Sequence, residues 1–181
     1  MPPKQRITRE MILKSAFVMF CNEGMEVVNA RSVAKALGCS TQPIFSYFTG
    51  MQELKDALDA KAQEMYATDV TALPESDNWL VDMCAAHVHF ACAHMNVYNH
   101  LFSSVRLNPA RLTGYSALFA ALVDHVQKKE GVSHEIARKI VDEVGIYANG
   151  LINRLQVKGV DSTDVTQRLC AAYDIILKHL S

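Results

Sequence analysis

The stretch around Gly38 constrains the fold of this chain more than any other, because a short helix is predicted on either side of that glycine. Asn29 can cap a helix over 30–37, and Gly38 suits the left-handed backbone position that commonly ends a helix. A second helix is predicted over 41–48, with Ser40 as its cap. Helices this short are not stable alone. We therefore expect both to dock on a neighbouring helix, as in a helix-turn-helix.

The helix on which they dock is predicted just before them. Thr8 can cap its first turn. The apolar side chains that follow recur at a spacing near 3.6 residues; they are Leu13, Ala16, Phe17 and Phe20. Gly24 suits the end of this helix. Pro43 falls in the first turn of the third helix, where its missing N–H costs no helical hydrogen bond.

Behind residue 50 the pattern stays helical and shows no β-type alternation of any length. Helices are predicted over 51–70, 77–94, 98–105, 110–130, 133–158 and 161–180, with Ser133 and Asp161 as caps of the last two. The chain has only 5 prolines and 8 glycines, which favours helix over a turn-rich β fold. We expect an all-α fold of about nine helices, with a helix-turn-helix domain over 1–50 and a helical domain over 51–181.

Composition limits the classes of partner and the compartment. Residues 1–48 hold six Lys and Arg against three Asp and Glu, whereas the whole chain of 181 residues has a net charge of −1. A polyanion would therefore be bound by the front end. The 5 cysteines form no CxxC pair, which indicates neither a disulfide framework nor a zinc ribbon. No signal peptide and no apolar run near the ~20 residues of a membrane span is visible, so we expect a soluble, cytoplasmic protein.

The N-terminal residues resemble the signature of TetR-type repressors over roughly residues 9–58. The resemblance rests on Arg9, Ile12-Leu13, Ala16, Met19-Phe20, Glu23-Gly24, Ala30 to Ala34, Leu37 to Ser40, Ile44 to Phe48 and Glu53-Leu54. Two positions depart from it. Asn29 replaces the usual threonine cap, and Met51 replaces a lysine that usually meets a phosphate, with Lys55 as its candidate substitute. The resemblance implies a homodimeric repressor of transcription that encloses a small-molecule effector in its C-terminal domain. No cofactor is predicted.

A short helix that enters the major groove reads bases with side chains near its N-terminus. Here these side chains are Ser40, Thr41, Gln42, Phe45 and Ser46. Gln42 can pair bidentately with adenine, Phe45 can pack on a thymine methyl, and Arg31 can fork onto guanine or a phosphate. Tyr47 and Lys55 suit phosphate oxygens. The alternative interpretation of each residue alone is a solvated surface or, for Phe45 and Tyr47, the core.

The segment 79–102 is rich in aromatic, histidine and methionine residues at helical spacing. An apolar wall with a few polar tips is what a small-molecule pocket needs. We predict that a small apolar or amphipathic effector binds Met83, His87, Phe90, His94 and Tyr98, with Phe102, Phe119, Tyr147 and Asn149 from neighbouring helices. The alternative is a filled core, in which case the protein binds DNA without an effector.

Two further functions compete with an effector-controlled regulator. The histidines of the segment 84–100, with Cys84 and Cys92, invite a metal-responsive regulator, but their spacing matches no established zinc pattern and no metal site is predicted. A helical enzyme using this segment with Asp82 or Asp124 is the other alternative. The sequence contains no Ser-His-Asp order, HExxH motif, phosphate loop or dinucleotide fingerprint, so we predict no catalytic residue.

The last two long helices carry apolar stripes that suit pairing with a second copy. We predict a dimer interface formed by Val144, Ala148, Leu151, Leu155, Leu169, Tyr173 and Ile176. Two helices from each partner would form a four-helix interface. Two helix-turn-helix units about one turn of DNA apart then require a near-palindromic operator of double-stranded DNA. The effector would act by changing the separation of the two units.

Overall fold

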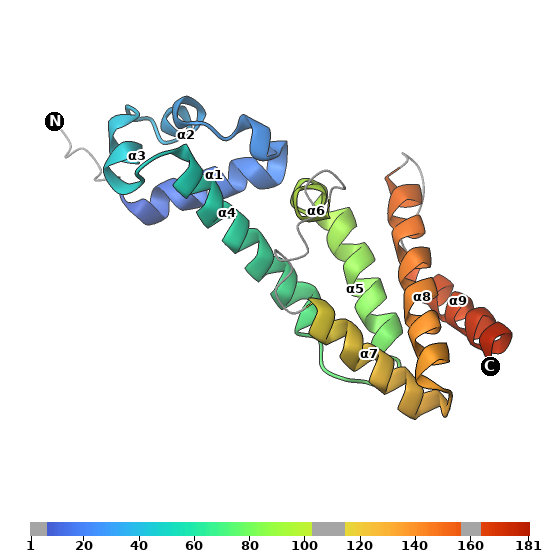
Figure 1. Ribbon diagram of the computed structural model, residues 1–181. Coiled ribbons are helices and arrows are strands. Elements are labelled where there is room, and N and C mark those ends of the chain that lie inside the picture. The colour runs from blue at the N-terminus through green and yellow to red at the C-terminus, as the bar shows by residue number, and fades with distance from the viewer. Residues whose placement is uncertain (1–6, 103–114, 157–163) are drawn as a thin grey trace. The chain divides into compact units, whose positions relative to one another are not determined.

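The computed structural model describes residues 7–102, 115–156 and 164–181. Within these ranges the chain forms nine α-helices and no strand (Figure 1). The helices are α1 (Arg9–Glu23), α2 (Ala30–Ala36), α3 (Gln42–Tyr47), α4 (Met51–Tyr66), α5 (Trp79–Ala93), α6 (Met95–Phe102), α7 (Tyr115–Glu130), α8 (His134–Leu155) and α9 (Val165–Leu180). The expected all-α fold of about nine helices is confirmed. The expected cap at Asp161 lies outside the described residues.

The chain divides into two compact units. Of the described residues, the first unit comprises 7–65 with 94–102, and the second comprises 66–93 with 115–156 and 164–181. α6 therefore packs with the N-terminal helices, whereas α5, the helix just before it in the sequence, belongs to the second unit. This is a division by packing, and the functional division at residue 50 stays a prediction.

The first unit is built on α1, whose ends are formed as predicted. The Thr8 hydroxyl oxygen accepts a hydrogen bond from the Met11 N–H at 3.2 Å, and Gly24 ends the helix at a φ of 95°. The core of the unit consists of side chains with almost no exposed surface: Ile12, Ala16, Phe20, Val33, Ile44, Phe48, Leu54 and Leu58. Leu13 and Phe17, predicted on the buried stripe, are only half-buried, because the helix turns its Ile12–Ala16–Phe20 row inward.

Two polar contacts hold α6 within the first unit. The Asn96 amide nitrogen donates to the Cys21 carbonyl at 3.0 Å, at the C-terminal end of α1. The His100 Nε2 atom lies 2.8 Å from an Asp59 carboxylate oxygen on α4. The His100 ring also meets Phe20 edge to face, with ring centroids 5.1 Å apart. α6 is thus joined to both α1 and α4.

In the second unit, α5, α7, α8 and α9 pack around a common apolar core. Its fully buried members include Val88, Ala91, Ala137, Ile140, Val144, Ala148, Ile152 and Leu169. Ser133 caps α8 as predicted, since its hydroxyl oxygen accepts from the Ile136 N–H at 3.3 Å. The Tyr173 hydroxyl donates to Glu130 at 2.7 Å and so joins α9 to the end of α7.

Some details of the predicted helices are wrong. The short helix predicted over 98–105 begins earlier, at Met95. Ser40 does not cap α3: the N-cap is Thr41, whose backbone is already helical and whose side chain makes no capping bond. The predicted helix over 51–70 is α-helical only to Tyr66, and Ala67–Thr71 continues it as a π-helical segment. There the Ala72 N–H donates to the Ala67 carbonyl at 2.8 Å, which is the wider ring of a π-turn.

Candidate nucleic-acid interface and ligand cavity

A hydrogen-bonded turn after α2 sets the direction of α3. The Gly38 N–H donates to the Lys35 carbonyl at 3.2 Å, and the Cys39 N–H donates to the Ala34 carbonyl at 3.0 Å. With Gly38 at a φ of 64°, these two bonds form a Schellman motif. A left-handed backbone costs a residue with a Cβ roughly 1–2 kcal/mol. Glycine at this position therefore fixes the corner between the two helices.

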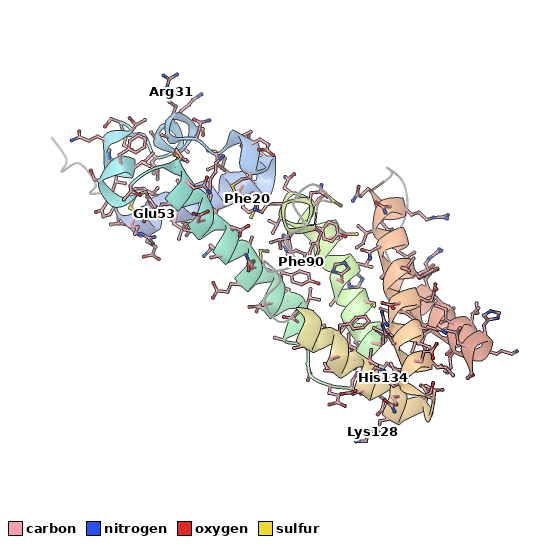
Figure 2. All side chains as sticks on the ribbon, in the orientation of Figure 1. Phe20, Arg31, Glu53, Phe90, Lys128 and His134 are labelled. Atoms are coloured by element: carbon pink, nitrogen blue, oxygen red, sulfur yellow. The ribbon has the colours of Figure 1, made fainter. Side chains whose placement is uncertain are left out.

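The start of α2 is fixed by a capping box. The Asn29 side-chain oxygen accepts from the Arg31 N–H at 3.1 Å and from the Ser32 N–H at 3.0 Å, and the Ser32 hydroxyl oxygen accepts from the Asn29 N–H at 3.1 Å. Asn29 thus does the capping that the sequence predicted. In this first turn the Arg31 side chain is exposed and points away from the helix (Figure 2).

α3 has one buried face and one exposed face. Ile44 and Phe48 are 0% and 1% exposed and fix the helix to the core of the unit. Phe45 is 52% exposed, and Gln42 and Ser46 are exposed on either side of it. The exposed face therefore presents an amide, an aromatic ring and a hydroxyl, the kinds of group that read base edges in the major groove.

The other predicted DNA contacts lie around this face. Ser40 is exposed, while Thr41 and Lys55 are half-buried. Two hydroxyls have backbone partners: Ser46 donates to the Gln42 carbonyl at 3.0 Å, and Tyr47 donates to the Ile7 carbonyl at 3.2 Å. The structure thus brings six of the eight predicted residues together at 40–47, and Arg31 and Lys55 flank them on α2 and α4.

Sequence reasoning assigned no role to Glu53, which secures the turn between α3 and α4. Its carboxylate accepts from the Thr49 N–H at 2.7 Å and from the Thr49 hydroxyl at 2.9 Å. The backbone bond and then the hydroxyl bond hold the pKa of Glu53 below its ordinary value. Nearby, the Arg9 guanidinium lies 4.7 Å from the centre of the Phe48 ring. These contacts position α3 from its C-terminal end.

The second unit contains a cavity of about 240 Å³. Its apolar wall is formed by Val70, Leu80, Met83, Leu118, Phe119, Leu122, Val141 and Ala148. Polar wall residues include Tyr66, His87, Asn149 and Asp142, and the Tyr66 hydroxyl lies 2.9 Å from His87 Nδ1. A largely apolar cavity with a few convergent polar groups is the common form of a small-molecule site.

Burial controls the protonation of two groups in the cavity wall. Burial lowers the pKa of His87 below its ordinary value, and a hydrogen bond with Asn149 opposes this in part. Burial also raises the pKa of the Cys84 thiol to about 12. At neutral pH the wall therefore holds a neutral imidazole and a neutral thiol, so neither supplies charge to a bound molecule.

The arrangement of helices is similar to that of two solved structures. A TetR-like transcriptional regulator from Rhodococcus sp. RHA1 superposes with a TM-score of 0.65 at 12% identity, over 96% of this chain and 99% of that chain. The chain has a TetR-like fold. A second structure, assigned to the TetR family and also from Rhodococcus sp., superposes with a TM-score of 0.54 at 16% identity, over 93% of this chain and 98% of that chain. The sequence itself matches no family model and no curated protein.

Within this TetR-like fold, the cavity collects some of the predicted effector contacts and not others. Met83, His87, Phe119 and Asn149 line it. Phe90 is buried on α5 (Figure 2), where its ring meets that of Tyr66 edge to face, and Tyr147 is exposed. His94, Tyr98 and Phe102 belong to the first unit. Sequence reasoning missed Tyr66 and Val70, which come from the last residue of α4 and from the π-helical segment that follows it.

The predicted dimer residues lie mostly inside the TetR-like second unit. Val144, Ala148, Leu151, Leu169 and Tyr173 are buried in the single chain, and Leu155 and Ile176 are half-buried. The exposed apolar side chains of α8 and α9 are a different set. Ile146 is 64% exposed, Ile175 is 70% exposed, and Tyr147 is also exposed. The stripes read from the sequence are therefore the faces that α8 and α9 turn toward their own core.

Neither a cluster of metal ligands nor a helix able to span a membrane is found among the described residues. Among the described residues, no three histidine, cysteine or acidic side chains gather as a set of metal ligands. Cys84 and His87 face the cavity, whereas His89 and Cys92 are exposed on α5. None of the described helices has the length and apolar character that crossing a membrane requires.

Proposed function

We propose that this chain is a TetR-family transcriptional regulator that binds a specific DNA sequence through α3. The observation that carries the proposal is the exposed face of α3, where Gln42, Phe45 and Ser46 stand outward on a helix fixed by its buried residues. Gln42 suits an adenine edge, and Phe45 suits a thymine methyl. Arg31, exposed on α2, suits guanine or a phosphate.

The same reasoning favours a homodimer on a near-palindromic operator. A single helix-turn-helix buries little DNA surface, and two copies about one helical turn apart double it. The exposed Tyr147 on α8 and Ile175 on α9 supply an apolar surface for pairing. These exposed residues replace the dimer interface predicted from the sequence, whose members are mostly buried. A side chain already packed in the core of its own chain is not accessible to a partner.

We further propose that the protein is a repressor, released from DNA when a small apolar or amphipathic effector occupies the cavity. α4 begins at Met51, just after α3, and ends at Tyr66 in the cavity wall. An effector that displaces Tyr66 therefore acts on the helix that follows the recognition helix. It lowers DNA affinity only if it binds the DNA-incompetent state more tightly.

The test of DNA recognition is selection of bound duplexes from a random pool by the full chain. We expect an enriched inverted repeat whose half-site centres lie about 10 base pairs apart. Gln42→Ala and Phe45→Ala should each weaken binding to the selected sequence by roughly 1–3 kcal/mol, the worth of one base contact. A pool that stays unenriched after repeated rounds would count decisively against the proposal.

The matched control for Phe45 is Val18 on α1, which is also 52% exposed. Val18→Ala removes an exposed apolar side chain from the same unit but not from α3. We expect it to leave affinity for the selected sequence within about twofold, as for an ordinary surface substitution. If Val18→Ala and Phe45→Ala weaken DNA binding alike, α3 is not the element that reads the sequence.

A further inference from the structure

Three neutral polar groups of the cavity form one hydrogen-bonded chain. The Tyr66 hydroxyl lies 2.9 Å from His87 Nδ1, His87 is hydrogen-bonded to Asn149, and the Asn149 amide nitrogen donates to the Gly145 carbonyl at 3.0 Å. The Asn149 amide nitrogen is thus engaged with the α8 backbone, and His87 lies between Tyr66 and Asn149 in this chain of hydrogen bonds.

The cavity offers little to a charged ligand. Asp142 is the one charged side chain among its lining residues that the structure describes. Its side chain is exposed and lies 3.9 Å from Arg138, so its charge is both paired and screened by solvent. A bound carboxylate would meet no lysine or arginine in the described wall. Burying an ion without a partner is far more costly than burying a neutral polar group.

The size of the cavity limits the ligand further. Its volume of about 240 Å³ is slightly below the roughly 300 Å³ at which pockets for drug-sized molecules begin. A ligand of one or two rings suits a space of this size.

From these observations we propose that the cavity binds an uncharged ligand of one or two rings with a single hydrogen-bonding group, which exchanges hydrogen bonds with Tyr66, His87 and Asn149. The proposal rests on the proposed function only in taking this cavity as the effector site. The ligand enters beside α8 at Gly145, where an added Cβ would meet no atom within 4 Å. The neighbouring side chains of Asp142, Ile146 and Asn149 are exposed around this point.

The ligand class is tested with four probes of matched shape, measured by calorimetry on the full chain. They are 2-naphthol, 2-methylnaphthalene, 2-naphthoate and 2-naphthylmethylammonium. We expect 2-naphthol to bind, the two ions to bind at least about tenfold more weakly, and 2-methylnaphthalene to bind at least about threefold more weakly for want of the hydrogen bond. Either ion binding as tightly as 2-naphthol, or no binding of 2-naphthol at millimolar concentration, would overturn the proposal.

The polar end is tested with His87→Leu. This substitution removes the middle of the hydrogen-bonded chain, so the preference for 2-naphthol over 2-methylnaphthalene should fall below that of the wild type, with Tyr66 and Asn149 as the remaining polar groups. A variant that still prefers 2-naphthol as strongly as the wild type would refute the assignment of the polar end. Circular dichroism at the temperature of the titration establishes that the variant is folded.

The entry beside α8 is tested with Gly145→Leu and its control Gly150→Leu. Both glycines lie in α8 with open space at the Cβ position, and only Gly145 lines the cavity. Leucine is a better helix former than glycine, so both variants should fold. We expect Gly145→Leu to lose 2-naphthol binding by at least about tenfold, because its side chain fills the opening, and Gly150→Leu to keep it. Equal behaviour of the two variants would overturn the proposed entry.

These tests are independent of DNA recognition. If 2-naphthol binds as expected but no duplex is selected, the regulator function fails while the ligand class stands. If a duplex is selected but 2-naphthol fails to bind, the ligand class fails while DNA recognition stands.

Discussion

The phenolic hydroxyl of Tyr47 donates a hydrogen bond to the backbone carbonyl of Ile7 at 3.2 Å, across 40 residues of sequence. Tyr47 is the last residue of α3, and Ile7 lies just before α1. The bond therefore joins the end of the candidate recognition helix to the segment that leads into the first helix. A hydroxyl has one proton to donate, so Tyr47 must redirect it in order to bind a phosphate oxygen.

Tyr47→Phe is expected to weaken binding to every duplex by roughly 0.5–1.5 kcal/mol, the net worth of one hydrogen bond. The loss should be the same for specific and non-specific DNA, because phosphate contacts carry no sequence information. Titration of two labelled duplexes, one selected and one scrambled, measures it. A loss confined to the selected duplex would show that Tyr47 reads a base instead.

Met51 stands at the first position of α4 and is half-buried there. A lysine at this point would add the phosphate contact that TetR-type sequences usually have. We expect Met51→Lys to raise affinity for any duplex and to steepen the slope of log affinity against log salt by about 0.9. Met51→Gln is the uncharged control and should leave the slope unchanged. Equal slopes for the two variants would show that no phosphate lies within reach.

Gly38 has a φ of 64° and open space at its Cβ position. Gly38→Ala should therefore lower stability through backbone strain alone, by roughly 1–2 kcal/mol. Gly145→Ala is the contrasting control, since this glycine lies inside α8 at an ordinary φ. Alanine there should raise stability by about 1 kcal/mol. Urea unfolding followed by circular dichroism measures both, and a stabilising effect of Gly38→Ala would contradict the role given to the Schellman turn.

The helices and most of their caps could be predicted from the sequence because these features are local. Thr8, Asn29 and Ser133 each bond an N–H within three residues, so residue type and position suffice. The cap assigned to Ser40 failed for a reason that the sequence alone does not reveal. After the Schellman turn, Thr41 rather than Ser40 occupies the N-cap position, with a helical backbone and no capping bond from its side chain. α3 therefore begins at Gln42, one residue later than predicted.

The cavity and the faces of the last helices were harder to predict because they depend on which helix covers which. Periodicity shows that Val144 and Ala148 share a face of α8, but not whether α9 or a second chain covers it. The break between α5 and α6 was predicted, but periodicity cannot show that His94 and Tyr98 pack in a different unit from His87. The effector contacts that were predicted on one stripe are therefore divided between the two units.

Tyr173 donates its hydroxyl to a Glu130 carboxylate oxygen at 2.7 Å, and the Lys129 ammonium lies 5.2 Å from the centre of the tyrosine ring. Burial, followed by the bond to Glu130, raises the pKa of Tyr173 well above its ordinary value. Tyr173→Phe should lower the free energy of unfolding by roughly 1.5–3 kcal/mol, as for a bond to a charged acceptor. Tyr147→Phe, at an exposed tyrosine of α8, should change it by less than about 0.5 kcal/mol. Equal effects would argue against the bond to Glu130.

Burial keeps the pKa of His87 below its ordinary value. The unfolded chain therefore binds more protons than the folded chain between the two pKa values, and stability falls as the pH drops from about 7 toward the folded value. His87→Gln removes this titration, so its free energy of unfolding should fall less than that of the wild type between about pH 7.5 and 5.5. Met83→Leu changes the same cavity wall without changing a titratable group and should keep the wild-type slope. If His87→Gln also keeps that slope, the imidazole is not held neutral by the fold.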